Sequence, residues 1–116
     1  MQKSPNGNNM HKDNKNIVLT GEEALSVLSE INYLLISLRD IARYYYHSQS
    51  DDNMINNEIA YCKETTEFID RNKITHRLAY IRMIITEKFN NELGDDDMDD
   101  IEREMEKIKY WEKPGD

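Results

Sequence analysis

Residues 20–47 read TGEEALSVLSEINYLLISLRDIARYYYH, and this stretch decides the fold. Apolar residues recur in it at alternating intervals of three and four, the spacing of one face of an α-helix. The residues of this stripe are Leu28, Ile31, Leu35, Leu38, Ala42 and Tyr45. A second row widens the stripe on one side, as expected inside a bundle, and consists of Val27, Leu34 and Ile41. Thr20 and Glu23 have capping-box spacing, so the helix is predicted to begin at Thr20 and end near His47.

Apolar residues at helical spacing continue through the rest of the chain, over residues 50–69, 74–89 and 98–111. A tight break at residues 70–73 is predicted between the first two of these segments, and one continuous long helix is the alternative. Leu93-Gly94 is predicted to end the third helix of the chain, because glycine suits the left-handed conformation that follows many helices. Four helices with short connections indicate an all-α fold, an antiparallel bundle of about four helices over residues 20–113.

Composition sets the outer limits of what this chain can be. It has 116 residues, of which 38% are hydrophobic and 33% charged, enough for one domain with a small core. Residues 1–19 are polar and rich in Asn, so they are predicted to form a flexible tail. No run approaches the ~18 apolar residues of a membrane span, and residues 1–16 lack the apolar core of a signal peptide. We therefore expect a cytoplasmic protein.

The single cysteine, Cys62, excludes an internal disulfide and any metal site built from several cysteines. It lies on the apolar stripe of the second predicted helix, where we expect a small buried thiol rather than a nucleophile. The chain also lacks a Gly-rich phosphate loop and the HExxH, CxxC and GxSxG motifs. No metal and no cofactor is therefore expected, and a binding protein is favoured over an enzyme.

Charge is unevenly distributed along the chain, whose formal net charge is −8. Residues 20–70 carry ten acidic and three basic residues, and residues 92–116 carry eleven acidic and four basic residues. Between them, residues 71–91 carry five basic residues and one acidic residue. The overall charge repels phosphate, so direct nucleic-acid binding is disfavoured outside the basic segment.

The densest acidic run consists of Asp95, Asp96, Asp97, Asp99 and Asp100. One interpretation is that these carboxylates stabilise a helix N-terminus, where each contributes about 0.3–1 kcal/mol. A calcium-binding EF-hand loop is excluded, because Asp100 stands where the loop needs glycine and Arg103 stands at its ninth position. The remaining interpretation is a surface that meets a cationic partner and speeds association by electrostatic steering.

Residues 71–76, RNKITH, form the sharpest local pattern. An Arg-Asn pair followed by three residues and His resembles the signature of the HEPN (higher eukaryote and prokaryote nucleotide-binding) helical ribonucleases. The resemblance implies a small helical bundle, usually dimeric, that cleaves RNA without metal in a cleft at the dimer interface. It implies that Arg71 holds the scissile phosphate, that His76 is the general acid or base, and that Asn72 orients them. A solvated helix start explains the same six residues.

In size, acidity and helical content the chain is similar to small helical immunity proteins of bacterial contact-dependent inhibition systems. That similarity implies an inhibitor that neutralises a basic protein partner, a toxin or nuclease, by filling its cationic cleft with carboxylates. The residues predicted to bind the partner combine carboxylates with two aromatic anchors: Asp95, Asp96, Asp97, Asp99, Asp100, Glu102, Glu106, Tyr110 and Trp111. The ribonuclease that uses Arg71, Asn72 and His76 is the alternative. A third hypothesis is an acidic module that self-associates through the heptad-like face of the first helix.

Overall fold

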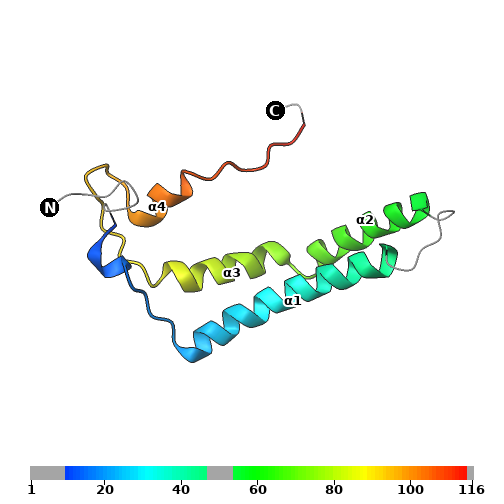
Figure 1. The fold of residues 1–116 in the computed structure, drawn as a ribbon, viewed down its shortest axis with the longest axis horizontal. Helices are drawn as coiled ribbons and strands as arrows, with labels where there is room; N and C mark the ends of the chain where they lie inside the picture. Colours follow the sequence, from blue (N-terminus) through cyan, green and yellow to red (C-terminus); the bar gives the residue numbers. More distant parts are fainter. Residues whose placement is uncertain (1–9, 47–53, 115–116) are drawn as a thin grey trace. The chain divides into compact units, whose positions relative to one another are not determined.

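The computed structural model describes residues 10–46 and 54–114 (Figure 1). Within these residues all regular structure is helical and no strand is present, which confirms the predicted all-α fold. The elements are the 3₁₀ helix η1 (Lys12–Asn14) and the α-helices α1 (Gly21–Tyr46), α2 (Met54–Arg71), α3 (Ile74–Thr86) and α4 (Asp100–Met105). None of the described helices has the length and apolar character needed to cross a membrane.

The chain divides into two compact units. We call Leu19–Ile84 the hairpin unit, and Met1–Val18 together with Ile85–Asp116 the terminal unit. The prediction of a single domain over residues 20–113 with a tail before it stays a prediction. The two units are described separately below.

Helix α1 begins with the predicted capping box. The backbone N–H of Glu23 donates to Thr20 Oγ1 at 3.0 Å, and the N–H of Thr20 donates to Glu23 Oε1 at 2.9 Å. These two bonds satisfy donors that the first turn of a helix leaves without an intrahelical partner. The other predicted end, His47, and the predicted opening of the second helix at residues 50–52 lie outside the described residues.

A sharp break separates α2 from α3, as predicted, and excludes one continuous helix. Lys73 has a φ of 51°, in the left-handed region that costs a non-glycine residue about 1–2 kcal/mol. Asn72 stabilises the turn, since its Nδ2 donates to the carbonyl of Phe68 at 3.0 Å. The chain therefore leaves α2 at Arg71 and starts α3 at Ile74.

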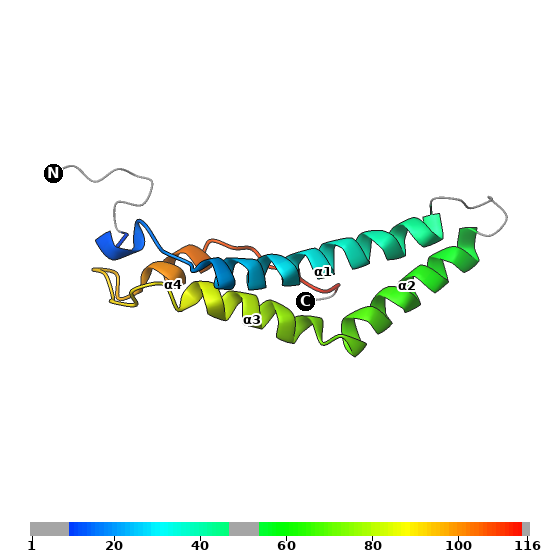
Figure 2. The same ribbon diagram turned by 90° about the horizontal axis from the view of Figure 1, so that it is seen from below.

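The three longer helices form an antiparallel hairpin with a broken second arm (Figure 2). Two aromatic contacts and one hydrogen bond join the arms along the length of the hairpin. The ring centroids of Tyr46 and Tyr61 lie 5.1 Å apart, and those of Tyr33 and Phe68 lie 5.7 Å apart. Ser26 Oγ and Tyr80 Oη lie 3.0 Å apart. Residue numbers fall along α1 as they rise along α2 and α3. Helix α2 thus lies beside the second half of α1, and α3 lies beside the first half.

Arg77 joins α1, α3 and the turn before α3. Its Nη1 donates to Glu30 Oε2 at 3.0 Å, its Nε donates to the Asn72 carbonyl at 3.0 Å, and its guanidinium lies 4.3 Å from the Tyr33 ring centroid. Tyr33 Oη in turn donates to Asn72 Oδ1 at 2.9 Å. These contacts bind the break in the second arm to the middle of α1.

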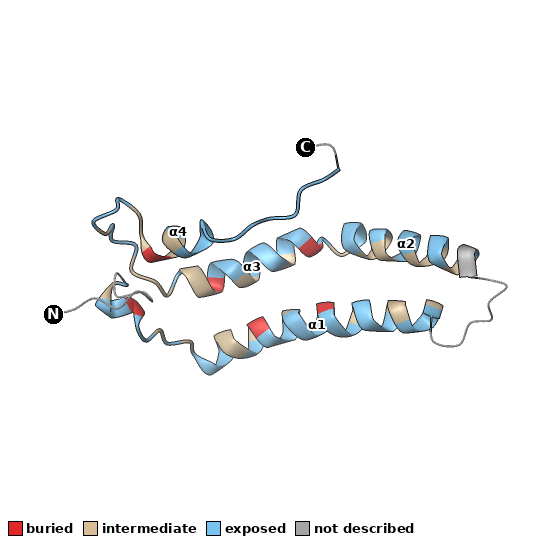
Figure 3. Ribbon diagram, turned by 45° about the horizontal axis from the view of Figure 1, so that its top comes forward, coloured by how far each residue is buried: buried red, intermediate tan, exposed pale blue. Residues whose placement is uncertain are grey.

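The core of the hairpin unit is thin (Figure 3). The buried apolar residues of the described chain are Val27, Leu34, Ile74 and Ile84. Val27 and Leu34 belong to the second row of α1, the one that was expected only to widen the stripe. The residues of the main stripe Leu28, Ile31, Leu35 and Leu38 are 40–60% exposed. Cys62, expected to be buried, is also exposed.

Two predicted helix ends were wrong. Helix α3 ends at Thr86 rather than at Leu93-Gly94, because the backbone beyond it turns to pair with the N-terminal segment; the N–H of Asn90 donates to Asn14 Oδ1 at 2.7 Å. Helix α4 has six residues, although helical spacing continues to residue 111. The like charges of Glu102 and Glu106, at a spacing of four residues, oppose a longer helix.

Replacing Arg77 by Ala is expected to lower the free energy of unfolding by about 1–3 kcal/mol, because it removes an ion pair, a hydrogen bond and a cation–π contact together. Urea denaturation followed by circular dichroism measures this change. The control is Arg39→Ala, since Arg39 is exposed and its contact to Asp40 is 3.9 Å long; we expect a change within about 0.5 kcal/mol. Equal effects of the two substitutions would contradict the role assigned to Arg77.

Candidate functional site

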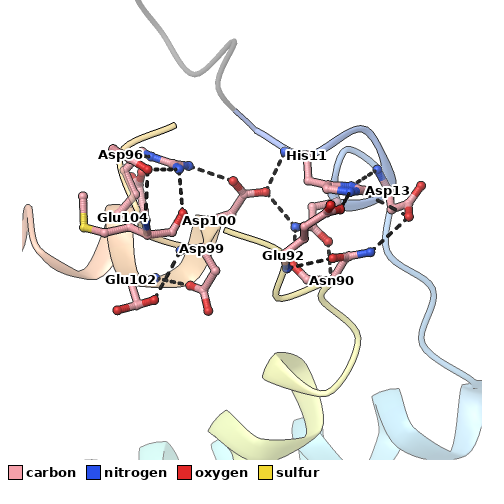
Figure 4. A network of polar contacts seen from close by, with 12 residues as sticks. His11, Asp13, Asn90, Glu92, Asp96, Asp99, Asp100, Glu102 and Glu104 are labelled. Carbon is pink, nitrogen blue, oxygen red and sulfur yellow. Dashed lines mark hydrogen bonds and ion pairs between the residues drawn. The ribbon is translucent and has the colours of Figure 1, made fainter. Parts of the chain in front are cut away.

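The acidic run of the terminal unit is organised around Arg103, on α4, whose partners Asp96 and Asp100 are labelled in Figure 4. The Arg103 Nε and Nη2 atoms donate to the two oxygens of Asp96 at 2.6 and 2.9 Å. Its Nη1 donates to Asp100 Oδ1 at 2.7 Å, and Nη2 also donates to the carbonyl of Met98 at 3.0 Å. One cation therefore neutralises two of the five aspartates and fixes the loop before α4. We call these four residues the Arg103 cluster.

Asp100 is the buried member of this cluster, with 7% of its side chain exposed. Its Oδ2 accepts hydrogen bonds from Asn14 Nδ2 at 2.7 Å and from the backbone N–H of His11 at 2.8 Å. Together with the bond from Arg103, these donors provide the compensation that a buried carboxylate needs. The Asp100 side chain is occupied inside the unit and presents almost no surface to a partner.

The hydrogen bonds of the cluster shift the pKa values of its members. The bonds from Arg103 lower the pKa of Asp96 below its ordinary value of 3.8. Burial alone would raise the pKa of Asp100, but the hydrogen bonds from Asn14, Arg103 and the His11 backbone outweigh burial and lower it. The same two carboxylates raise the pKa of Arg103. All three groups are therefore held in their charged forms.

The N-terminal segment is tied to the cluster by polar side chains. Asn14 is buried, and besides Asp100 its Nδ2 contacts the Asn90 carbonyl at 3.0 Å. His11 Nε2 lies 2.8 Å from Glu92 Oε2. Residues 1–19 were expected to form a flexible tail; residues 1–9 lie outside the described residues, and His11 and Asn14 are hydrogen-bonded in this unit. Sequence pattern missed them because the contacts join polar residues more than 75 positions apart.

Asp99 and Glu102 form the capping box of α4. Asp99 Oδ1 accepts from the N–H of Glu102 at 2.8 Å, and Glu102 Oε1 accepts from the N–H of Asp99 at 3.2 Å. Of the two interpretations of the acidic run, helix stabilisation thus accounts for this pair. Asp97, with a φ of 62°, occupies the left-handed position of the loop before α4.

The remaining residues predicted to bind a partner are exposed. Asp95, Asp97 and Glu106 are exposed, although Asp95 has intramolecular interactions as well. Tyr110 and Trp111 follow α4 in a segment without regular structure, and 66% and 82% of their surfaces are exposed. The predicted set is thus split between an internal network and an exposed group of carboxylates and aromatic rings.

The residues of the ribonuclease-like pattern lie at the break in the hairpin unit. Arg71 ends α2 and His76 lies in the first turn of α3, and both are exposed. Asn72 does not orient them, because its side chain accepts from Tyr33 and donates to Phe68 instead. Neither Arg71 nor His76 is held in place by a hydrogen bond or ion pair to the described part of the chain.

Among the described residues, no group of three or more His, Cys, Asp or Glu side chains is arranged to hold a metal ion. Comparison of the chain with known protein families, with curated proteins and with solved structures found no match. The candidate sites therefore rest on the chain's own residues.

Arg103 was the principal residue that sequence analysis missed. It was used only to exclude an EF-hand, yet its spacing contained a signal: Asp100 is three residues before it in a predicted helix, a favourable position for an ion pair. The contact with Asp96 lies across a loop and gives no comparable pattern.

The buried and exposed aspartates make a matched test. Asp100→Asn is expected to destabilise the terminal unit by about 1–3 kcal/mol, because it removes a charge-assisted bond and turns an amide N–H toward donors. Asp97→Asn should change the stability of the terminal unit by no more than about 0.5 kcal/mol, since Asp97 is exposed and Asn also adopts the left-handed conformation. Hydrogen exchange at the His11 and Asn90 amides measures the difference, and equal protection in both variants would contradict it.

The lowered pKa values predict how this unit responds to acid. Because the folded-state pKa of Asp96 and Asp100 lies below the unfolded value near 3.8, their stabilisation is complete above that value and is lost as pH falls through the folded-state pKa. Titration of the carboxyl carbons by NMR should give midpoints below 3.8 for both residues. Arg103→Gln should move the midpoint of Asp96 upward, and a midpoint unaffected by that substitution would refute the role of Arg103.

Proposed function

We propose that this protein is a binding protein that neutralises a basic macromolecular partner, an immunity- or antitoxin-type inhibitor that occupies the cationic cleft of a bacterial nuclease toxin. The observation that carries the proposal is the pair Tyr110 and Trp111, which are 66% and 82% exposed in the segment that follows α4. Large aromatic side chains are unfavourable in water and are enriched at the energetic centres of interfaces.

The proposed binding surface lies in a part of the chain with a negative net charge. Residues 92–116 carry a net charge of −7, from eleven acidic and four basic residues. Arg103 neutralises Asp96 and Asp100 inside the unit, and Asp99 and Glu102 cap α4, so the exposed carboxylates proposed to meet a partner are Asp97 and Glu106. Exposed carboxylates of this kind raise the association rate with a cationic cleft and form charge-assisted hydrogen bonds with its Lys and Arg residues.

The Arg103 cluster has a supporting part in this proposal. A loop held by a bidentate ion pair and a capping box is already ordered before binding, so little conformational entropy is lost there when a partner docks. Asp96, Asp99 and Asp100 then act by fixing the position of their exposed neighbours. This division of roles replaces the expectation that all five aspartates face the partner.

The second candidate function is a metal-independent ribonuclease that uses Arg71 and His76. Its support is that both side chains are exposed and lie close together along the chain, at the end of α2 and the start of α3. A guanidinium can bind a phosphate and an imidazole can transfer a proton near neutral pH. The occupied side chain of Asn72 counts against it. Purified protein that cleaves RNA, with the activity lost in His76→Ala, would favour this candidate over the inhibitor.

The inhibitor proposal is tested with the purified product of the gene adjacent to this one, because immunity genes commonly lie next to their toxin genes. The native chain should bind that product and block its nuclease activity. Trp111→Ala should weaken binding by about 30-fold or more, the effect of removing an interface hot spot. Isothermal titration calorimetry measures the dissociation constant.

The matched control is Tyr44→Ala, since Tyr44 is 73% exposed but belongs to the hairpin unit; it should bind like the native chain. The double substitution Asp97→Asn with Glu106→Gln should slow association and reduce its dependence on salt. Binding that is unaffected by Trp111→Ala, or a partner whose nuclease remains fully active in the complex, would overturn the proposal.

A further inference from the structure

Helix α1 has two apolar rows, and only one of them is buried within the chain. Val27 and Leu34 are buried. Leu28, Ile31, Leu35 and Leu38 lie on average about 70° further round the helix, at the a and d positions of a heptad repeat, and are 54%, 42%, 60% and 40% exposed. Such a continuous apolar stripe is typical of a contact with another helix.

The second arm carries exposed apolar residues on the same side. On α2, Ile69 and Cys62 lie about 90° beyond the row of Tyr61 and Phe68 that faces α1, and on α3, Leu78 lies about 100° beyond Arg77. Two antiparallel helices are related by a two-fold axis perpendicular to the plane that contains them, and this rotation keeps the front of the pair at the front. Residues that are displaced in the same sense around each helix, starting from the contact between the helices, therefore lie on the same side of the hairpin. We call this side the open face.

The hairpin unit has too little buried apolar surface to be stable by itself. Among the described residues of the whole chain four apolar residues are buried, and none is completely shielded from solvent. A small domain with so thin a core is usually completed by a disulfide, a metal or association. The chain's single cysteine excludes the internal disulfide, and the described residues hold no metal-binding group. Association through the open face is what remains.

We propose that the open face is the interface of a homodimer, in which two hairpin units pack face to face as two layers, each with two helical arms. The charges on the open face favour a second copy as the occupant. Arg77 is paired with Glu30 inside the chain, so the arginine of α3 that is left for a partner is Arg82, about 40° beyond Leu78. On α2, the exposed Glu58 lies about 60° beyond Tyr61, in the same sense of rotation as Cys62.

A two-fold axis that runs across the helices brings these opposite charges together, because it places α3 of one copy opposite α2 of the other. Arg82, exposed and without an ion pair to the described residues, then faces Glu58 of the second copy. An open depression lined by Thr75, Leu78, Ala79 and Arg82 offers a hole for an apolar side chain of the second copy.

The first test is the mass of the full chain in solution. Sedimentation equilibrium should give twice the chain mass of 13.8 kDa. Leu35→Glu should raise the dissociation constant of the dimer by about 30-fold or more, because it buries a charge in the apolar interface. The matched control is Ile36→Glu: Ile36 is also exposed and apolar but lies outside the open face, so the dimer should persist. Arg82→Glu should weaken the dimer through like-charge repulsion.

The second test uses Cys62 as a reporter in the unmodified protein and does not depend on how the variants fold. The thiol is exposed in one copy and lies on the open face. Its rate of reaction with a thiol reagent should therefore rise as the protein is diluted through the dissociation constant. The melting temperature should fall over the same dilution, since dissociation removes the stabilising partner.

Any of three other outcomes would overturn the homodimer proposal. A monomer with a reactive Cys62 would show that the open face stays uncovered or serves a different partner. A monomer with a protected Cys62 would show that another segment of the same chain covers it. A dimer that survives Leu35→Glu and is broken by Ile36→Glu would place the interface elsewhere.

Discussion

The hairpin depends on the contacts of Arg77 near the α2–α3 turn, which join it to Glu30, the Tyr33 ring and the Asn72 carbonyl. A 26-residue helix is about 39 Å long, and no single shorter helix covers it. Two helices do so here only because the chain bends at Lys73 and is then held against the middle of α1. The same bend determines which residues of α3 face α1 and which are left exposed.

Local features of the sequence were reliable guides to this structure. The capping box at Thr20 and Glu23 is a bond between residues three apart, so the spacing alone defined it. The break before Ile74 was also predicted. The identity of the buried row was not predicted, because periodicity shows that α1 has apolar rows but not which neighbour covers each row.

The candidate site shows a second limit of sequence reasoning. Counting charges along residues 92–116 treats each carboxylate as available to a partner. In the folded unit Asp96 and Asp100 are paired with Arg103, and Asp100 is also bonded to Asn14, from the other end of the chain. Those pairings depend on tertiary structure and leave no periodic signal. The part of the predicted binding surface that stays exposed in the folded unit includes above all Tyr110 and Trp111.

The polar construction of the Arg103 cluster has a consequence for how the molecule loses its structure. The terminal unit is held by ion pairs and by amide and imidazole hydrogen bonds, whereas the hairpin unit relies on apolar and aromatic contacts. Apolar burial produces most of the heat-capacity change of unfolding, and ionic pairing contributes little to it. Calorimetry should therefore resolve two transitions, a shallow one that shifts with acidity and a steep one that carries nearly all the heat-capacity increment.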